Sequence, residues 1–250
     1  MPTRRSFIKL SSLGAVAASA RAVSAQPAPP VATGPLPPSI AALSSMKALA
    51  RPVTVDERRA RVEKARRLMA VSGIDGLLLA GGTSLVYFGN VRWWISERFF
   101  GIVVPLKGTP FVVCPAFEED RAREQLALGP FGDAEVRTWQ EDEDPYALVA
   151  TGLKNRGIAA GRLGIEEKTY FNFADGVGRA APALKVVSAT PVTAGCRMIK
   201  SPHEIELMRL ASAVTLKAYA AHNADSVIWL SHRHRMASAG SSRARSCSHV

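Results

Sequence analysis

The chain has 250 residues, of which 47% are hydrophobic, so it can bury one large core or two small ones. Its formal net charge of +11 raises the question of a nucleic-acid partner. The basic residues are spread over the amino terminus, a helical segment at 51–67 and the tail, without the interleaved aromatic residues that base stacking requires. We therefore expect no nucleic-acid binding, and a solvated face for the helical cluster.

Residues 1–25 resemble a twin-arginine export signal. Arg4 and Arg5 precede Phe7 and Lys9, and a short, weakly apolar segment then ends in a small-residue cleavage pattern. This segment is shorter than the roughly 20 residues needed to cross a bilayer. We expect it to be removed after export by the twin-arginine route, which leaves a periplasmic or extracellular protein without a membrane anchor. An uncleaved anchor and a disordered basic terminus are the alternatives.

Two regions follow the signal. Residues 26–50 are rich in proline and alanine, which predicts an extended linker without a core of its own. Residues 51–200 begin with a helix, because Thr54 and Glu57 have the spacing of a capping box and apolar residues recur behind them at helical period. The apolar run 74–80 then has the pattern of a strand buried on both faces.

The rest of this region continues the alternation of helices and strands. In chain order the patterns predict a short helix or turn (84–90), two strands around a turn (101–115), a helix (117–128), a strand (134–139), a helix (144–157), a strand (161–167), a helix (172–180) and a strand (184–189). Gly81 and Gly82 lack the spacing of a phosphate loop and predict a tight turn. Together these elements indicate an α/β fold, with a central mixed sheet and helices on both of its faces.

Four segments of the sequence resemble the amino-terminal domain of the creatinase, prolidase and Xaa-Pro aminopeptidase family. They are GIDGLLLAGGTSLVYFGN, FFGIVVPLKGTPFVVCP, GRLGIEE and RMIKSPHEIELMRLASAVT, and the resemblance spans residues 54–221. The last segment is similar to the junction between the two domains of the family. Here Ser201, Pro202 and Glu204 supply an N-cap, a first-turn proline and a capping box. We expect residues 201–221 to form the first helix of a truncated catalytic domain, or else the last helix of a one-domain protein.

The resemblance implies a function for the intact family. Its amino-terminal domain caps the active site of a second domain or takes part in a homodimer. The second domain holds two divalent metal ions (Mn, Co or Zn) on two Asp, one His and two Glu. These metals activate a water that cleaves peptides with proline in the second position. The resemblance therefore implies an exported metallopeptidase, an Xaa-Pro aminopeptidase or dipeptidase, with a peptide substrate.

The chain itself does not supply these ligands. After Glu206 its only acidic residue is Asp225, whereas two hard metals need several oxygen ligands and an imidazole. Three widely spaced cysteines give no metal motif, although a disulfide between Cys114 and Cys196 is an open alternative. We therefore predict no catalytic residue, no metal ligand and no bound cofactor in this chain.

The tail changes composition abruptly. Residues 222–250 are rich in histidine, serine and arginine and show no sustained period, so we expect them to be disordered. One hypothesis is that the reading frame is lost near Ala221, and a natural truncation is the alternative. Reading the downstream DNA in all three frames for the five metal ligands distinguishes the two.

A possible contact surface lies in the segment NVRWWISERFF. In related proteins the corresponding loop lies near the active-site mouth or the dimer contact, so the resemblance implies peptide or dimer contacts for Arg92, Trp93 and Trp94. Alternatively, the tryptophans fill the core. His203 lies in the first turn of its helix, and we expect it to be exposed rather than catalytic, with its charged form disfavoured there.

Three functions are therefore compatible with the sequence. The first is a non-catalytic cap domain from an exported Xaa-Pro peptidase. The second is a stand-alone module that binds a peptide or dimerises without hydrolysis. The third keeps the family but is a fragment of a creatinase-like amidinohydrolase. Metal content and peptide hydrolysis discriminate the first two.

Overall fold

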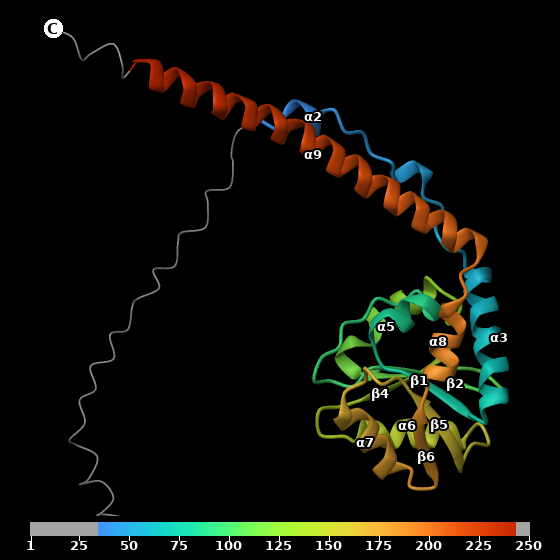
Figure 1. The fold of residues 1–250 in the computed structure, drawn as a ribbon. Coiled ribbons are helices and arrows are strands. Elements are labelled where there is room, and N and C mark those ends of the chain that lie inside the picture. The colour runs from blue at the N-terminus through green and yellow to red at the C-terminus, as the bar shows by residue number, and fades with distance from the viewer. Residues whose placement is uncertain (1–34, 244–250) are drawn as a thin grey trace, which may run out of the picture.

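The computed structural model describes residues 35–243, and the burial of side chains as far as residue 224. A mixed sheet of six strands is covered on both faces by helices, and a long helix extends away from it (Figure 1). The predicted fold class is confirmed. The predicted export signal, with Arg4, Arg5, Phe7 and Lys9, lies outside the described residues. No helix in the described part combines the length and the apolar character needed to cross a membrane.

The sheet has the strand order β4-β3-β2-β1-β5-β6. Its strands are β1 (Gly76–Leu79), β2 (Gly101–Pro105), β3 (Phe111–Pro115), β4 (Glu135–Trp139), β5 (Gly161–Ile165) and β6 (Leu184–Ser188). Strands β2 and β3 form the predicted antiparallel hairpin. Strand β1 pairs antiparallel with β2 on one edge and parallel with β5 on the other. Strand β3 pairs parallel with β4, and β5 pairs parallel with β6, so β2 alone runs opposite to the other strands of this sheet.

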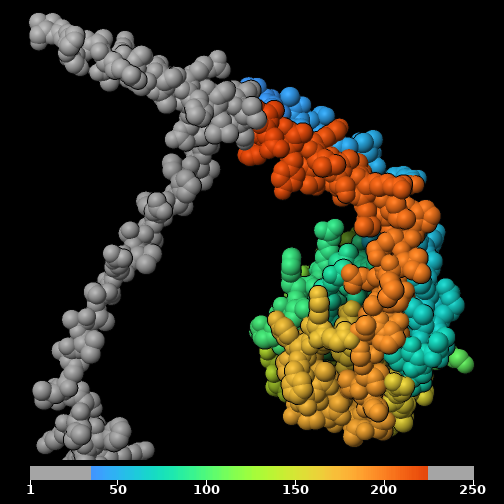
Figure 2. Space-filling model, viewed as in Figure 1, coloured from blue at the N-terminus to red at the C-terminus, as the bar shows by residue number. Residues whose placement is uncertain are grey.

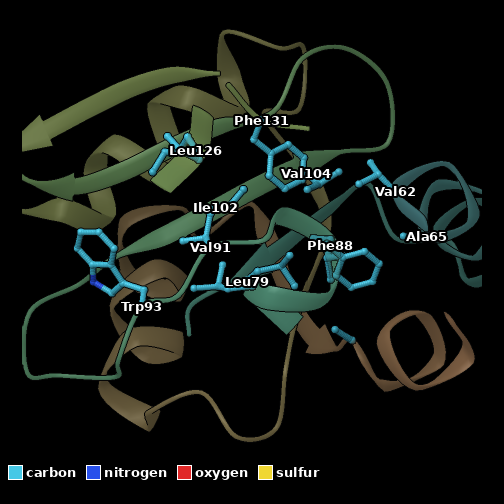
Figure 3. Packing of buried hydrophobic residues seen from close by; sticks show 14 of the residues in the cluster. Val62, Ala65, Leu79, Phe88, Val91, Trp93, Ile102, Val104, Leu126 and Phe131 are labelled. Carbon is cyan, nitrogen blue, oxygen red and sulfur yellow. The ribbon is translucent and has the colours of Figure 1, made fainter. Parts of the chain in front are cut away.

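Alternate residues of the central strands point into two separate cores. In β1, Leu77 and Leu79 belong to the first core, whereas Leu78 belongs to the second core on the opposite face of the sheet. This follows from the two-residue period of a strand, which sends successive side chains to opposite faces. Figure 3 shows the first core, in which Leu79 and Ile102 from the sheet lie near Phe88 and Val91. Both faces of the sheet are thus buried, as the apolar run predicts.

The first core is covered by four helical elements and the second by two. The first four are α3 (Val55–Ser72), the π-helix η2 (Leu85–Gly89), α5 (Glu119–Ala127) and α8 (Thr190–Met198). The second two are α6 (Pro145–Lys154) and α7 (Phe171–Ala180). Short turns α4 (Gly82–Ser84) and η3 (Ala116–Glu118) precede η2 and α5.

The ends of α3 and α6 follow their sequence signals. Thr54 Oγ1 accepts a hydrogen bond from the amide of Glu57 at 3.2 Å, and Glu57 Oε2 accepts one from the amide of Thr54 at 2.7 Å. Gly73 ends α3 in the left-handed conformation, with φ 62°. Asp144 accepts a hydrogen bond from the amide of Tyr146 at 2.9 Å, so it caps α6 at the start of the helix predicted over 144–157.

The long helix α9 (Pro202–Arg243) begins with the predicted capping box. Ser201 Oγ accepts from the amide of Glu204 at 3.1 Å, and Glu204 Oε2 accepts from the amide of Ser201 at 2.8 Å. The structure differs from the prediction of disorder from residue 222, because the helix continues to Arg243. No glycine or proline interrupts residues 203–239, and the segment contains many alanines, so nothing local ends the helix.

The predicted linker is also not extended throughout. Its second half contains α2 (Pro38–Ala41) and the 3-10 helix η1 (Lys47–Leu49), which run alongside α9 (Figures 1 and 2). Ser39 Oγ donates a hydrogen bond to the carbonyl of Ala221 at 2.7 Å. Neither short helix contains a buried residue, which agrees with a segment that has no core of its own.

Two helical glycines give a matched test of the second core. A methyl group at Gly152 in α6 would lie 2.3 Å from Phe111 Cε2, whereas one at Gly178 in α7 has no atom closer than 3.8 Å. We expect Gly152→Ala to lower the free energy of unfolding by about 1 to 3 kcal/mol through overpacking. Gly178→Ala should raise it by up to about 1 kcal/mol through helix propensity. Urea unfolding followed by circular dichroism measures both, and equal changes would contradict the packing described here.

Candidate functional site

A crevice of about 300 Å³ lies at the carboxyl ends of β1 and β5. These two strands are parallel neighbours, but the chain leaves them in opposite directions. After β1 it continues toward β2, and after β5 it continues through α7 toward β6 on the other side. Ligand sites in open α/β sheets form at such points, because the diverging connections leave space between them.

Most of the residues that line this crevice have polar or charged side chains. They come from the turn after β1, the loop after β5 and one face of α8. The residues with functional groups that matter here are Ser84, Glu166, Glu167, Lys168, Thr193 and Arg197. An acidic and a basic group therefore share one small, concave site.

Glu166 is the half-buried acid of this crevice. Its burial raises the pKa of its carboxyl group, while the hydrogen bond from Ser84 and the charge of Arg197 oppose this effect. The Ser84 hydroxyl, itself buried, donates to Glu166 Oε1 at 2.5 Å. Glu167 differs, because hydroxyl groups of Ser188 and Thr190 donate to it and lower its pKa. The pKa values of these two neighbouring carboxyl groups are thus shifted in opposite directions.

Arg197 is the basic group of the crevice. Its side chain is half-buried on α8. Within the described part of the chain, its guanidinium forms no ion pair and donates no hydrogen bond, although its charge acts on Glu166. A half-buried guanidinium without an internal partner leaves its donors available to a ligand.

The predicted contact residues divide between the core and the surface. Trp93 is only 7% exposed, and its ring stacks on Phe100 with centroids 4.0 Å apart. Arg121 covers its other side at 4.2 Å. Trp94 is 84% exposed, and Arg92 is exposed as well. Trp93 therefore fills the core, and the contact prediction stays open for Arg92 and Trp94.

The loop that carries Trp94 borders the crevice. Ile95 lines the crevice and packs directly on Gly81, where a methyl group would lie 2.5 Å from Ile95 Cγ1. Gly81 also has φ 140°, a conformation that favours glycine. The tight turn predicted at Gly81 and Gly82 is confirmed, and it lets the loop approach the end of β1.

A second polar site, which we call the junction cluster, joins α3 to the start of α9. It consists of Arg51, Glu57, Arg61, His203, Glu204 and Glu206. Arg61 pairs with Glu204 at 2.8 Å, and both side chains are mostly buried, at 13% and 16% exposure. The exposed residues Arg51 and Glu206 form a further ion pair. These contacts fix the first turn of α9 against the domain.

His203 occupies a different environment from the one predicted. Its Nδ1 lies 2.6 Å from Glu57 Oε1 and its Nε2 lies 3.1 Å from the carbonyl oxygen of Arg51, with only 18% of its side chain exposed. The hydrogen bond with Glu57 raises the pKa of His203. The pKa of Glu57 falls to about 2, chiefly through the Thr54 backbone amide and then through His203. The neighbouring carboxylate therefore outweighs the helix terminus, which we expected to disfavour the charged form, and the prediction that His203 is exposed is wrong.

The basic helical cluster is not a uniformly solvated face. Arg58 is only 7% exposed and donates to the carbonyl of Tyr87 at 3.1 Å and to Asn90 Oδ1 at 2.9 Å. Arg61 donates to the same carbonyl at 2.9 Å. The sequence holds a signal for this, because Arg58 continues the buried α3 stripe of Val62, Ala65 and Met69 at helical spacing. An arginine within the apolar stripe of a helix indicates a buried guanidinium that donates hydrogen bonds to carbonyl groups of a neighbouring segment.

The described residues show no group of three or more His, Cys, Asp or Glu side chains that could hold a metal ion. The two-metal site implied by the resemblance therefore does not fit them, and no catalytic step follows through a metal here. Cys114 and Cys196 are both buried and free, so the disulfide alternative is wrong. Burial raises the pKa of Cys114 to about 12, which leaves this thiol protonated and unreactive at neutral pH.

Comparisons with known proteins identify relatives of this region. The model of the creatinase/prolidase N-terminal domain matches residues 61–199. The probable dipeptidase PepE of Mycobacterium tuberculosis is 31% identical over 161 residues, which cover 64% of this chain and 41% of that protein. An uncharacterized peptidase of Schizosaccharomyces pombe is 32% identical over 176 residues, covering 65% of this chain and 36% of the relative.

A solved structure agrees with these matches. The crystal structure of dipeptidase PepE from Mycobacterium ulcerans has a TM-score of 0.55 and 27% identity, and the match covers 62% of this chain and 40% of that protein. The chain thus spans about 40% of the length of the proteins that it matches.

The pair of Arg61 and Glu204 can be tested against an exposed control. We expect Arg61→Ala to destabilise the chain by about 2 kcal/mol, between the values for exposed and buried pairs, since it leaves Glu204 without its partner. The first turns of α9 should exchange their amide hydrogens faster. Arg59 pairs with Asp56 at 2.9 Å with both side chains largely exposed, so Arg59→Ala should change stability by less than about 0.5 kcal/mol. Urea unfolding and hydrogen exchange measure both variants, and similar behaviour would refute the junction cluster as the anchor of α9.

Proposed function

The chain belongs to the creatinase/prolidase N-terminal domain family, and we propose that it is the cap domain of an exported Xaa-Pro peptidase, which does not itself hydrolyse peptides. The observation that carries the proposal is the part of the chain that matches the family model. The family model covers residues 61–199, which include the whole sheet, and the chain then enters α9. In this proposal α9 is the first helix of the catalytic half.

The substrate class follows from the named relatives. Two of the proteins matched are dipeptidases by name and one is a peptidase. This supports peptide hydrolysis as the activity of the intact protein, and we propose Xaa-Pro peptides as its specific substrates. In our proposal two divalent metal ions, Mn, Co or Zn, belong to the second domain and activate the attacking water. The cap domain then positions or encloses the peptide.

The same proposal places Arg92 and Trp94 in contact with a peptide or a second subunit. Their exposure supports this role, because a large aromatic ring that is 84% exposed commonly marks a contact surface. We propose a homodimer as the assembly of the intact protein. A stand-alone module that dimerises or binds a peptide would use the same surface, so the assay of hydrolysis decides between the two functions.

Hydrolysis of Ala-Pro by the purified chain tests the absence of activity. We expect no release of proline above the blank with Mn²⁺, Co²⁺ or Zn²⁺, since the described residues bring no metal-ligand group together. A full-length Xaa-Pro dipeptidase serves as the positive control. Proline release that requires one of these metals and scales with the amount of chain would overturn the proposed cap function.

Export is tested in bacterial cells. We expect the chain to appear in the periplasm, and the double substitution Arg4→Lys with Arg5→Lys to retain it in the cytoplasm, because the twin arginines are the recognised feature of the signal. Fractionation and immunoblotting measure the distribution. Substitution of Arg51, a basic residue outside the proposed signal, is the control and should leave export unchanged. Periplasmic chain in the double variant would contradict twin-arginine export.

A further inference from the structure

We propose that the crevice between β1 and β5 binds a small zwitterion, a free α-amino acid or a dipeptide. The acidic side would receive the ammonium group and the basic side the carboxylate. This site lies outside the proposed cap role and does not require the chain to be catalytic. It rests on the charges, the partners and the place of the crevice in the fold.

The acidic side is Glu166, held in place by one hydrogen bond. The buried Ser84 hydroxyl donates to Glu166 Oε1 and so orients the carboxylate within the crevice. No described donor bonds to Glu166 Oε2 in the structure. An ammonium group could donate to this oxygen, and charge-assisted hydrogen bonds of this kind are the stronger ones. Burial of the Glu166 carboxylate without a cationic partner at hydrogen-bond distance is unfavourable, and an ammonium group would supply that partner.

The basic side is Arg197, which reaches the crevice from α8. Its guanidinium influences Glu166 through its charge but forms no ion pair with it or with any other described residue. The two charges thus face one crevice without neutralising each other directly. A planar guanidinium presents donors that match a carboxylate in a bidentate arrangement. Lys168 adds a second positive charge to the lining.

The size and chemistry of the crevice narrow the class of ligand. Its volume of about 300 Å³ is at the lower end of small-molecule sites, which suits an amino acid or a dipeptide. A phosphate or another simple anion would meet the negative charges of Glu166 and Glu167. A bare cation would meet Arg197 and Lys168. Only a ligand that carries both charges can pair with both the acidic and the basic groups of the crevice.

Isothermal titration calorimetry on the purified chain tests the proposal. The probes are each of the standard L-amino acids and the dipeptide Ala-Pro, and inorganic phosphate is the control for a simple anion. We expect saturable binding of at least one amino acid or of the dipeptide. The N-acetylated and C-amidated forms of that probe should each bind at least about tenfold more weakly, because each loses one charge-assisted contact.

Two pairs of variants locate the binding. Glu166→Gln and Arg197→Gln should each weaken binding by about tenfold or more, since each removes one of the two charges but keeps a polar side chain. The matched controls are Glu124→Gln and Arg179→Gln, on the exposed surfaces of α5 and α7, and they should leave the affinity unchanged. Circular dichroism confirms that all four variants fold.

Three outcomes would overturn the proposal. They are no saturable binding by any amino acid or by the dipeptide up to about 10 mM, binding of phosphate alone, and binding that Glu166→Gln and Arg197→Gln leave unchanged. Each differs from failure of the cap function, which appears as metal-dependent release of proline. A chain without peptidase activity can still bind the zwitterion, and an active chain can have an unused crevice.

Discussion

The position of β1 is the constraint on which the rest of the structure depends. All of its residues are buried, both of its faces are covered, and both of its edges are paired. Such a strand must be apolar on both sides, and it therefore needs helices on each. Because β2 lies on one side of β1 and β6 lies beyond β5 on the other side, the chain leaves the two parallel strands β1 and β5 in different directions. The crevice is the space that this topology leaves open.

The helix α3 depends on buried charge as well as on apolar packing. Arg58 and Arg61 satisfy the carbonyl groups at the end of η2, which a helix terminus would otherwise leave unpaired. Arg61 then also neutralises Glu204 at the start of α9. Buried charges are costly unless they are hydrogen-bonded or paired: Arg61 is both, whereas Arg58 is held by hydrogen bonds to the backbone and to Asn90, with no ion pair among the described residues. The same side chains therefore close one helix and orient another.

Local signals in the sequence predict the elements whose ends they mark, and they do not predict contacts between distant segments. The capping boxes of α3 and α9 and the N-cap of α6 are visible as short motifs, and each forms. The only local signal for α8 is a proline in its first turn, whereas Thr190, Val192 and Gly195 have low helix propensity, and the helix forms by packing against α3 and the first core. Ser84 and Glu166 lie 82 positions apart in the chain, and only the parallel pairing of β1 with β5 brings them together. The neighbouring residues Trp93 and Trp94 likewise differ in burial, because tertiary packing places one in the core and the other on the surface. The composition of the segment does not indicate which of the two is buried.

The two polar sites are not mechanically independent, because they meet in the last turn of α8. Arg197 lines the crevice, while the carbonyl of Cys196 accepts hydrogen bonds from Lys64 Nζ at 2.9 Å and from the Tyr87 hydroxyl at 3.2 Å. The Tyr87 ring also lies under Arg61 of the junction cluster, at 4.0 Å. Cys196 is buried against α3, so this turn cannot shift without changing these contacts. A ligand that holds Arg197 would therefore restrain the last turn of α8, which leads into α9. Packed contacts thus link the crevice to the orientation of α9.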